Sequence, residues 1–215
     1  MKIGILGSGN MGRALGAAWA GCGHAIFFGG RTEASAISVA ERVGRRSVGG
    51  SLARAAAFGE VLVHTARDAM PSAMVEDARA LAGKVLIDLN NKPVPPGYAF
   101  EPVLESYAER YAVDVPGLRV VKAFNTLPVQ VFGYAPDILR RHAVTVFAAA
   151  DDADAKSIVM RLATEIGLAP VDAGPLRNAR VLEGFGDMLR YLINVAKLGA
   201  ATTLSARVLP PPGEA

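Results

Sequence analysis

The sequence predicts an α/β fold with a doubly wound, mostly parallel sheet, helices on both faces and a C-terminal helical extension. Two features carry this prediction. Short apolar runs alternate with segments of helical spacing over most of the 215 residues, which is the pattern of strands that pair in parallel through helical crossovers. The first apolar run leads directly into a glycine-rich turn that opens a helix. An apolar content of 51% supplies enough core for a three-layer domain.

Residues 1–31 predict the opening strand, turn, helix and strand. Residues 2–6 form an apolar run, residues 7–12 read GSGNMG, and helical spacing follows. A second apolar run ends in GGR at 29–31. A G-x-G-x-x-G motif alone often marks only a flexible loop, but here a strand precedes it and a helix follows. We therefore predict a Rossmann-type dinucleotide-binding unit.

Each glycine of the motif has a role in such a unit. Gly7 permits the tight turn, Gly9 lets the backbone approach a pyrophosphate, and Gly12 allows the helix to pack closely on the strand. The backbone N–H groups of Asn10 and Met11 then point at the phosphates, where the helix dipole favours negative charge.

The end of the second strand predicts which cofactor binds. An acidic residue there would bind the ribose hydroxyl of NAD, whereas an arginine favours the 2′-phosphate of NADP. The chain has Arg31 at this point, and its first carboxylate is Glu33. A guanidinium suits a phosphate, and the hydroxyls of Thr32 and Ser35 can donate further hydrogen bonds. We predict NADP(H); the alternative is that Arg31 is an ordinary solvated arginine.

Strands and helices continue to alternate along the chain. Further helices are predicted over residues 36–43, 51–58, 69–81, 103–111 and 152–166, and further strands over 45–48, 60–65, 85–89, 118–124, 143–149 and 168–172. Residues 93–116 are otherwise irregular and rich in proline. We predict a Rossmann domain over 1–175, a helical region over 176–198 and an irregular tail over 199–215.

Polar residues follow two of the predicted strands at their carboxyl ends, where doubly wound sheets bind ligands. Residues 65–67 follow one strand and should border the cofactor. His64 in the same strand is a candidate proton carrier, although a lone histidine at the end of an apolar strand is more often structural. Asn90 and Asn91 follow the next strand, where they either bind the ribose or the nicotinamide amide or simply form a turn.

Composition and spacing argue against several other classes of function. The single cysteine, Cys22, allows no internal disulfide and fits a reducing cytoplasm. A net charge of +3 is too small and too dispersed for a nucleic-acid-binding protein, yet suits an anionic cofactor. No apolar stretch is long enough to span a membrane, and the three histidines are scattered, so no metal site is predicted. The sequence has no nucleophile motif, which agrees with hydride transfer between bound cofactors.

Five segments together resemble one family. They are GSGNMG at 7–12, GGR at 29–31, IDLNNKP at 87–93, VVKAFNTLP at 120–128 and PVDAGPLRNARVLE at 170–183. In these segments the chain is similar to the NADPH-dependent reductases of the deazaflavin coenzyme F420, whose relatives include the cytoplasmic reductase domains of membrane ferric reductases. The segments are spread through residues 1 to about 195, so the resemblance covers nearly the whole chain.

For the nucleotide, the resemblance implies that the turn from Ser8 to Met11 binds the pyrophosphate of NADP. Arg31 stands where the family holds the 2′-phosphate, with help from the positions of Gly30 and Ser35. The helical region 176–198 would also build a homodimer interface near the site of the hydride acceptor.

For the reacting rings, the resemblance implies that Thr65 and Ala66 lie on the nicotinamide side of the cofactor. The segment Asn125 to Pro128 stands where the family stacks its deazaflavin on the nicotinamide. Archaeal F420 reductases carry a histidine at the position of Asn125, which matches instead the bacterial members and the ferric-reductase domains.

A deazaflavin that accepts a hydride at carbon needs two rings held face to face without water, rather than a strong acid. Ala66, Ala123 and Leu127 are the small or apolar walls expected around those rings. Positioning of the ring would fall to Asn125, Leu127 and Pro128, with no certain catalytic residue.

The predicted function is therefore hydride transfer between NADP(H) and F420. One alternative is an NADPH-dependent reductase of a flavin or of a small imine or carbonyl compound. A carbonyl acceptor would need a proton donor, for which His64, Tyr98 and Lys122 are the candidates. A second alternative is a non-catalytic NADP-binding protein.

Overall fold

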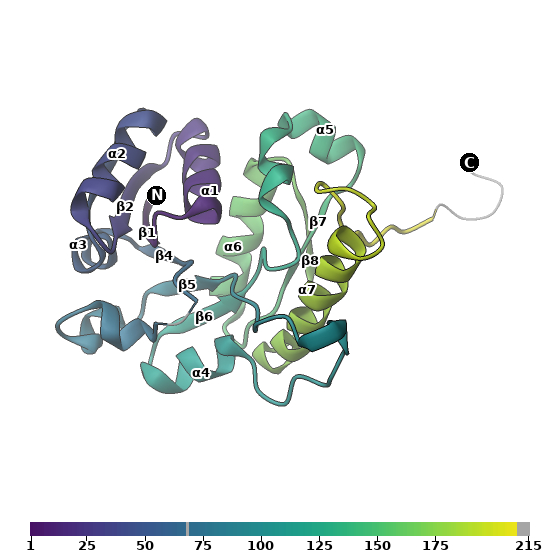
Figure 1. Ribbon diagram of the computed structural model, residues 1–215. Helices are drawn as coiled ribbons and strands as arrows, with labels where there is room; N and C mark the ends of the chain where they lie inside the picture. Colours follow the sequence, from purple (N-terminus) through teal and green to yellow (C-terminus); the bar gives the residue numbers. More distant parts are fainter. Residues whose placement is uncertain (68, 210–215) are drawn as a thin grey trace.

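A computed structural model describes residues 1–67 and 69–209 of the chain (Figure 1). Six parallel strands form the main sheet in the order β3-β2-β1-β4-β5-β6. The strands are β1 (Lys2–Leu6), β2 (Ala25–Gly30), β3 (Ser47–Ser51), β4 (Val61–His64), β5 (Val85–Asp88) and β6 (Arg119–Lys122). In register, Ile5 of β1 lies between Phe28 and Val63. This order, with β1 and β4 at the centre, confirms the predicted Rossmann-type α/β fold.

Helices cover both faces of the main sheet. The α-helices are α1 (Asn10–Gly21), α2 (Glu33–Val43), α3 (Leu52–Phe58), α4 (Tyr107–Asp114), α5 (Pro136–Arg141), α6 (Ala153–Glu165) and α7 (Ala179–Asn194). Buried residues of α1, α2 and α6 pack with one face of the sheet in one apolar core. Buried residues of α3 and α4 pack on the other face in a second core. Strands buried on both faces explain the continuous apolar runs in the sequence.

The last two strands form a sheet of their own. β7 (Thr145–Ala148) pairs in parallel with β8 (Ala169–Asp172). A single antiparallel bridge between Lys122 and Ala149 connects this pair to β6. The sequence predicted both strands, but their apolar runs carry no information about which neighbour each one pairs with.

The predicted helix over 69–81 is wrong. Two short 3₁₀ helices occupy Pro71–Met74 and Ala78–Leu81, separated by extended backbone at Val75 and Asp77. Polar side chains stabilise these turns locally, because the Asp114 carboxylate accepts hydrogen bonds from Ser72 and the Asp77 carboxylate accepts one from the backbone N–H of Arg79. Such side-chain bonds compete with a continuous helix.

Other element boundaries also differ from the prediction by a few residues, and two of the differences have a clear local cause. The helix expected over 103–111 begins at Tyr107, because Ser106 and Glu109 form a capping box. The strand expected over 45–48 begins at Ser47, because Arg45 and Arg46 adopt positive φ angles of 53° and 68° in the preceding turn.

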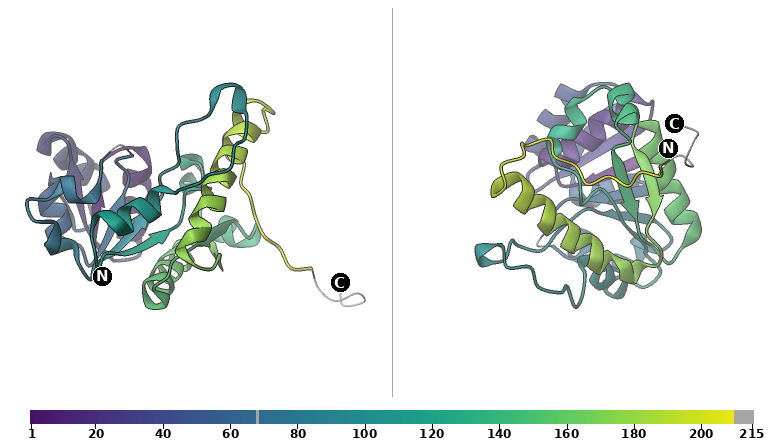
Figure 2. Two further views of the ribbon diagram at one scale, coloured as in Figure 1. Left: turned by 90° about the horizontal axis from the view of Figure 1, so that it is seen from below. Right: turned by 90° about the vertical axis from the view of Figure 1, so that its right-hand side faces the viewer.

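The C-terminal region is shorter as a helix than the sequence predicted. A 3₁₀ turn precedes α7, and α7 ends at Asn194. The chain then passes β7, where the backbone N–H of Ala206 donates to the Thr145 hydroxyl at 3.1 Å. Figure 2 shows this segment crossing beside the β7–β8 pair. Residues 210–215, part of the predicted tail, lie outside the described residues.

Trp19 joins three parts of the molecule. Its ring on α1 packs edge-on against Phe124, with ring centroids 5.7 Å apart. Its indole Nε1–H donates to the carbonyl of Leu162 in α6 at 2.9 Å. The helix that follows the glycine turn is therefore fixed both to the segment after β6 and to α6.

Residues 1–67 and 69–209 contain neither a candidate membrane span nor a candidate metal site. No helix there is both long and apolar enough to cross a bilayer. No group of three or more histidine, cysteine, aspartate or glutamate side chains in this part of the chain is arranged to hold a metal ion. Cys22 is exposed and caps the end of α1.

Candidate active site

A pocket of about 380 Å³ opens at the carboxyl ends of β1, β4, β5 and β6. Its lining comes from the start of α1 (Gly9, Asn10, Met11), the ends of β4 and β5 (Thr65, Arg67, Leu89, Asn90, Asn91), the turn after β6 (Phe124, Asn125, Leu127) and α7 (Arg190). The pocket includes the point where the strand order reverses between β1 and β4, which is where α/β sheets bind nucleotides.

The glycine turn is closely packed on one side and open on the other. Gly7 has φ +119°, and a Cβ atom there would collide with the Thr65 hydroxyl. That hydroxyl donates to the carbonyls of Leu6 and Gly7 at 3.1 and 2.9 Å. A Cβ on Gly12 would collide with the Gly7 carbonyl, whereas one on Gly9 would meet nothing within 4 Å. The turn therefore needs Gly7 and Gly12 for packing, and Gly9 leaves its outer side open.

The start of α1 leaves backbone donors available at the pocket. Gly9 is the N-cap residue and offers no side chain to bind the first N–H groups. Asn10 and Met11 follow it and line the pocket. Unpaired N–H groups at a helix N-terminus are a binding site for phosphate.

Arg31 and Thr32 lie in the turn between β2 and α2, and Ser35 lies in the first turn of α2. The strand before this turn, β2, is the neighbour of β1 in the sheet. All three residues are exposed and do not line the pocket itself. The Ser35 hydroxyl donates to the Thr32 carbonyl at 2.9 Å, which uses its one proton within the turn. A Cβ on Gly30 would lie 2.8 Å from that same carbonyl, so the backbone is compact beside Arg31.

His64 is fully buried and lies outside the pocket lining. The Asn90 amide donates to its Nδ1 at 2.8 Å, so its Nε2–H donates to the Ala69 carbonyl at 2.9 Å. The Tyr111 ring lies 4.6 Å away, centroid to centroid. Burial lowers the pKa of His64, which keeps the ring neutral. These contacts favour the structural role over that of a proton carrier.

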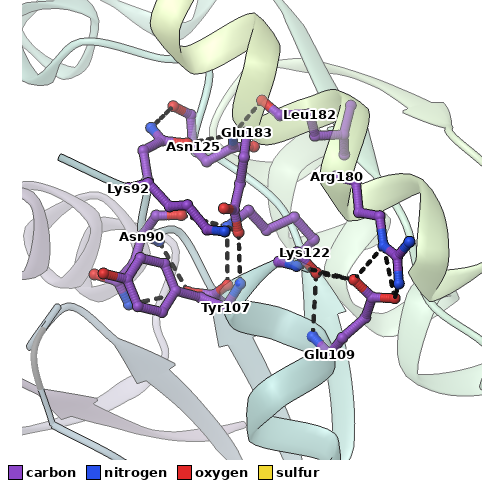
Figure 3. A network of polar contacts seen from close by, with 12 residues as sticks. Asn90, Lys92, Tyr107, Glu109, Lys122, Asn125, Arg180, Leu182 and Glu183 are labelled. Carbon is purple, nitrogen blue, oxygen red and sulfur yellow. Dashed lines mark hydrogen bonds and ion pairs between the residues drawn. The ribbon is translucent and has the colours of Figure 1, made fainter. Parts of the chain in front are cut away.

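Lys122, another candidate proton donor, is held in a buried ion cluster with Asp88 and Glu183 (Figure 3). Its Nζ donates to Asp88 Oδ2 at 2.9 Å, to Glu183 Oε1 at 2.8 Å and to the Asn90 carbonyl. Burial raises the pKa of Glu183, against the opposing charge of Lys122. The Nζ of Lys122 thus joins β5, β6 and α7, and Lys122 itself is not part of the pocket lining.

Asn91 and Asn125 lock the turn after β6 to its surroundings. The Asn91 amide donates to the Asn125 carbonyl at 2.8 Å, and the Asn125 amide donates to Asn91 Oδ1 at 2.8 Å and to the Leu182 carbonyl at 2.6 Å. Gly186 of α7 lies directly against Asn91. The two asparagines therefore bind each other, and Asn125 also binds α7.

The apolar wall of the pocket differs in part from the prediction. Leu127 lines the pocket, together with Leu89 and Phe124, which the sequence analysis did not single out as walls. Ala123 is fully buried in the core, and Ala66 is half-buried against the other core. Pro128 caps the 3₁₀ helix that follows.

Arg190 is a pocket residue that the sequence analysis missed. Its Nη1 donates to the Lys92 carbonyl at 2.7 Å and to Asp187 at 3.0 Å. Burial lowers the pKa of Arg190, and the charge of Arg67 acts in the same direction while Asp187 opposes it. Its position on α7 follows from tertiary packing alone, so no local pattern could have identified it. Tyr98, the third candidate donor, lies against Tyr191 with centroids 6.0 Å apart.

The chain is similar to F420-dependent NADP reductases both in sequence and in structure. The model of the family described as "NADP oxidoreductase coenzyme F420-dependent" matches residues 2–92. The F420-dependent NADP reductase of Methanothermobacter marburgensis is 31% identical over 207 residues, which cover 88% of this chain and 91% of that protein. A solved structure of a candidate F420-dependent NADP reductase from Arthrobacter sp. FB24 has a TM-score of 0.77 at 25% identity, covering 97% of this chain and 100% of that one.

A second kind of relative is a larger protein. The Metalloreductase STEAP3 of Rattus norvegicus is 29% identical over 182 residues, or 85% of this chain. The match spans 36% of the metalloreductase, so the chain corresponds to just over a third of that relative.

Proposed function

The chain belongs to the family of F420-dependent NADP oxidoreductases, and from this premise we propose that it transfers a hydride between NADP(H) and coenzyme F420. The observation that carries the proposal is the pocket itself. One continuous lining combines the open N-terminus of α1 with an apolar wall after β5 and β6. Such a pocket can receive the pyrophosphate and the nicotinamide end of a dinucleotide and leave one face of the nicotinamide ring against a second flat molecule.

The nucleotide is proposed to lie across the carboxyl ends of β1, β2 and β4. Backbone N–H groups from Ser8 to Met11 would bind the pyrophosphate, as helix N-termini bind anions. Arg31 at the end of β2 would bind the 2′-phosphate, with Thr32 beside it. The nicotinamide would then reach the pocket near Thr65 and Asn90.

The acceptor ring is proposed to lie between the nicotinamide and the segment Asn125–Pro128. NADPH supplies two electrons and a proton together as hydride, so the protein needs to orient two rings and exclude water. Phe124 and Leu127 provide apolar surface for this purpose. The engagement of His64 and Lys122 in structural contacts supports an acceptor that requires no acid from these residues.

The test is turnover of NADPH by the purified protein. With F420 as the acceptor, we expect NADPH absorbance to fall, and FMN in a parallel assay to give slower turnover. Turnover with FMN and none with F420 would replace F420 with a flavin acceptor. Tight NADPH binding without oxidation by either compound would favour the non-catalytic alternative.

We also propose a homodimer formed through α7. Val181, Phe185 and Met188 are 57%, 39% and 40% exposed on this helix, close to the exposed Phe100. An exposed apolar group of this kind is typical of an interface. We expect the protein to sediment at twice the chain mass, and Phe185→Glu to sediment as a monomer. Ile37→Glu on α2, where Ile37 is 41% exposed, is the matched control; equal effects of both changes would contradict an interface at α7.

A further inference from the structure

A second hollow, of about 330 Å³, lies between α5, the turn before it and the chain that follows α7. We call it the α5 groove. Among the described residues, its lining contains no lysine, arginine or carboxylate. The lining includes the apolar side chains and rings of Val131, Tyr134, Ile138, Leu139, His142 and Val144. A groove with apolar and aromatic walls is suited to an extended apolar or proline-rich segment.

Residues 206–209 form a C-terminal arm that is anchored to the body at its start and uncovered at its end. The backbone N–H of Ala206 donates to the Thr145 hydroxyl at 3.1 Å, and Arg207 Nη2 donates to the His142 carbonyl at 2.8 Å. The next two residues, Val208 and Leu209, are 100% and 83% exposed. Figure 2 shows the arm leaving the body of the molecule. Two apolar side chains are thus carried away from the surface of their own chain.

The sequence of the arm disfavours a return to the groove of its own chain. Leu209 is followed by prolines at 210–212, which lie outside the described residues. A residue before proline is restricted to extended backbone, and consecutive prolines favour a stiff extended chain. A reversal of direction just after Leu209 is therefore unfavourable, and the arm is expected to continue outward.

The start of the arm and the α5 groove are adjacent in one molecule, because Arg207 binds the carbonyl of the groove residue His142. This adjacency suits two copies related by a twofold axis. Under that symmetry, each arm reaches the groove of the partner by the same contacts, and the exchange closes without further copies.

The segment 201–206 connects the α5 groove with the exposed apolar face of α7. Ala201 and Thr203 line the groove. Residues 204–206 line a hollow on the other side, together with Phe185 of α7. The two surfaces are therefore continuous, and a dimer formed through α7 brings the groove of one copy close to the arm of the other.

We infer that two copies of this chain exchange their C-terminal arms, with Val208 and Leu209 of each copy bound in the α5 groove of the other. This inference rests on the proposed homodimer, to which it adds a second contact. The exchange covers the apolar end of the arm and the apolar groove together. Exposed apolar groups of this kind are typical of interfaces.

Disulfide formation tests which groove the arm enters. Cys22, the single cysteine of the chain and an exposed one, is first replaced by Cys22→Ser. Leu209→Cys and Ile138→Cys are then introduced singly and together. We expect the double variant to form a covalent dimer under mild oxidation on a gel without reductant, and each single variant to remain monomeric on that gel.

Leu198→Cys in place of Leu209→Cys is the control for this experiment. Leu198 is 64% exposed and follows α7, but it does not line the groove, so this pair should give little covalent dimer. A monomer that loses both thiols would place the arm in the groove of its own chain. A monomer that keeps both thiols would show that the arm enters neither groove, and either result would overturn the inference.

A sedimentation series measures what the exchange contributes to the dimer. Leu209→Ser should raise the dimer dissociation constant at least about tenfold, because a buried leucine is lost from each arm. Leu198→Ser makes the same chemical change at another exposed leucine and should leave the constant unchanged. Both side chains are exposed within one chain, so neither change should disturb folding. Equal constants for the two variants would contradict the exchange.

The same measurements separate this inference from the proposals on which it rests. A protein that sediments as a dimer but gives no cross-link would contradict the exchange and leave the α7 homodimer in place. A protein that sediments as a monomer and gives no cross-link would contradict both. Turnover of NADPH is measured with the unmodified protein and bears on hydride transfer alone.

Discussion

At the scale of single residues, the proposed choice of NADP over NAD depends on one guanidinium. Arg31 follows β2 in a compact turn and is exposed, so a bound 2′-phosphate would find it with little competition from the protein. Its first neighbouring carboxylate, Glu33, already belongs to α2. The proposed recognition of NADP over NAD can therefore be tested by removing Arg31, an exposed side chain that lies outside the core.

We expect Arg31→Ala to weaken NADPH binding by about 1.5–3 kcal/mol, the size of a hydrogen bond to a charged group. NADH binding should change little, because NADH lacks the 2′-phosphate. Fluorescence titration with both nucleotides measures the two affinities, and Arg42→Ala, an exposed arginine later in α2, is the control. Equal losses for NADPH and NADH would refute the role given to Arg31.

Single residues also show where sequence reasoning reached its limit. The roles of His64 and Lys122 depend on partners that lie 26, 34 and 61 positions away: Asn90, Asp88 and Glu183. A lysine within the apolar strand run and a glutamate on an apolar helix face are signals of a buried ion pair, since such charges are rarely buried alone. The pairing itself could not be predicted without the fold.

At the scale of elements, α7 packs against the pocket residue Asn91 at Gly186. A Cβ atom on Gly186 would lie 2.5 Å from Asn91 Oδ1, and the Asn91 side chain is the partner of Asn125. Gly184 on the same helix faces open space, with nothing within 4 Å. The two glycines therefore allow a controlled comparison within one helix, because Gly186 is closely packed and Gly184 is not.

Gly184→Ala should stabilise the protein by up to about 1 kcal/mol, because alanine is the better helix former. Gly186→Ala gains the same propensity but displaces Asn91, so we expect a net loss of stability and weaker binding in the pocket. Thermal unfolding at one protein concentration, together with NADPH titration, measures both effects. If Gly186→Ala stabilised the protein as much as Gly184→Ala, the close packing of α7 on Asn91 would be wrong.

Elements with a strong repeating pattern were predicted best. The buried strands and helices α1, α2, α3 and α6 follow from apolar runs and helical spacing, which depend on local sequence. The prediction for 69–81 failed because Ser72 donates hydrogen bonds to the carboxylate of Asp114, 42 positions away, which stabilises turns instead of a helix. Similarly, the glycine turn of the pocket was predicted from its motif, whereas its far wall on α7 was not.

At the scale of the whole molecule, the cluster of Asp88, Lys122 and Glu183 ties the main sheet to α7. Its side chains are 0%, 0% and 1% exposed. Removing one partner of a buried ion pair leaves an uncompensated charge, which costs far more than breaking a pair at the surface.

Lys122→Met should therefore lower the free energy of unfolding by about 3–5 kcal/mol. Arg79→Ala, which breaks a pair whose side chains are 91% and 55% exposed, should cost less than about 1 kcal/mol. Urea denaturation followed by circular dichroism measures both. A loss below about 1 kcal/mol for Lys122→Met would show that the two carboxyl groups are satisfied without the lysine.

Trp19 gives the protein an internal optical reporter. Trp19 is the only tryptophan in the chain, so all tryptophan fluorescence of the protein comes from this residue. Its ring packs against Phe124, which lines the pocket. Bound NADPH absorbs light in the range where tryptophan emits. Quenching of Trp19 with a matching rise in nicotinamide emission would therefore follow occupancy of the pocket in unlabelled protein, and a titration without this energy transfer would place the nucleotide elsewhere.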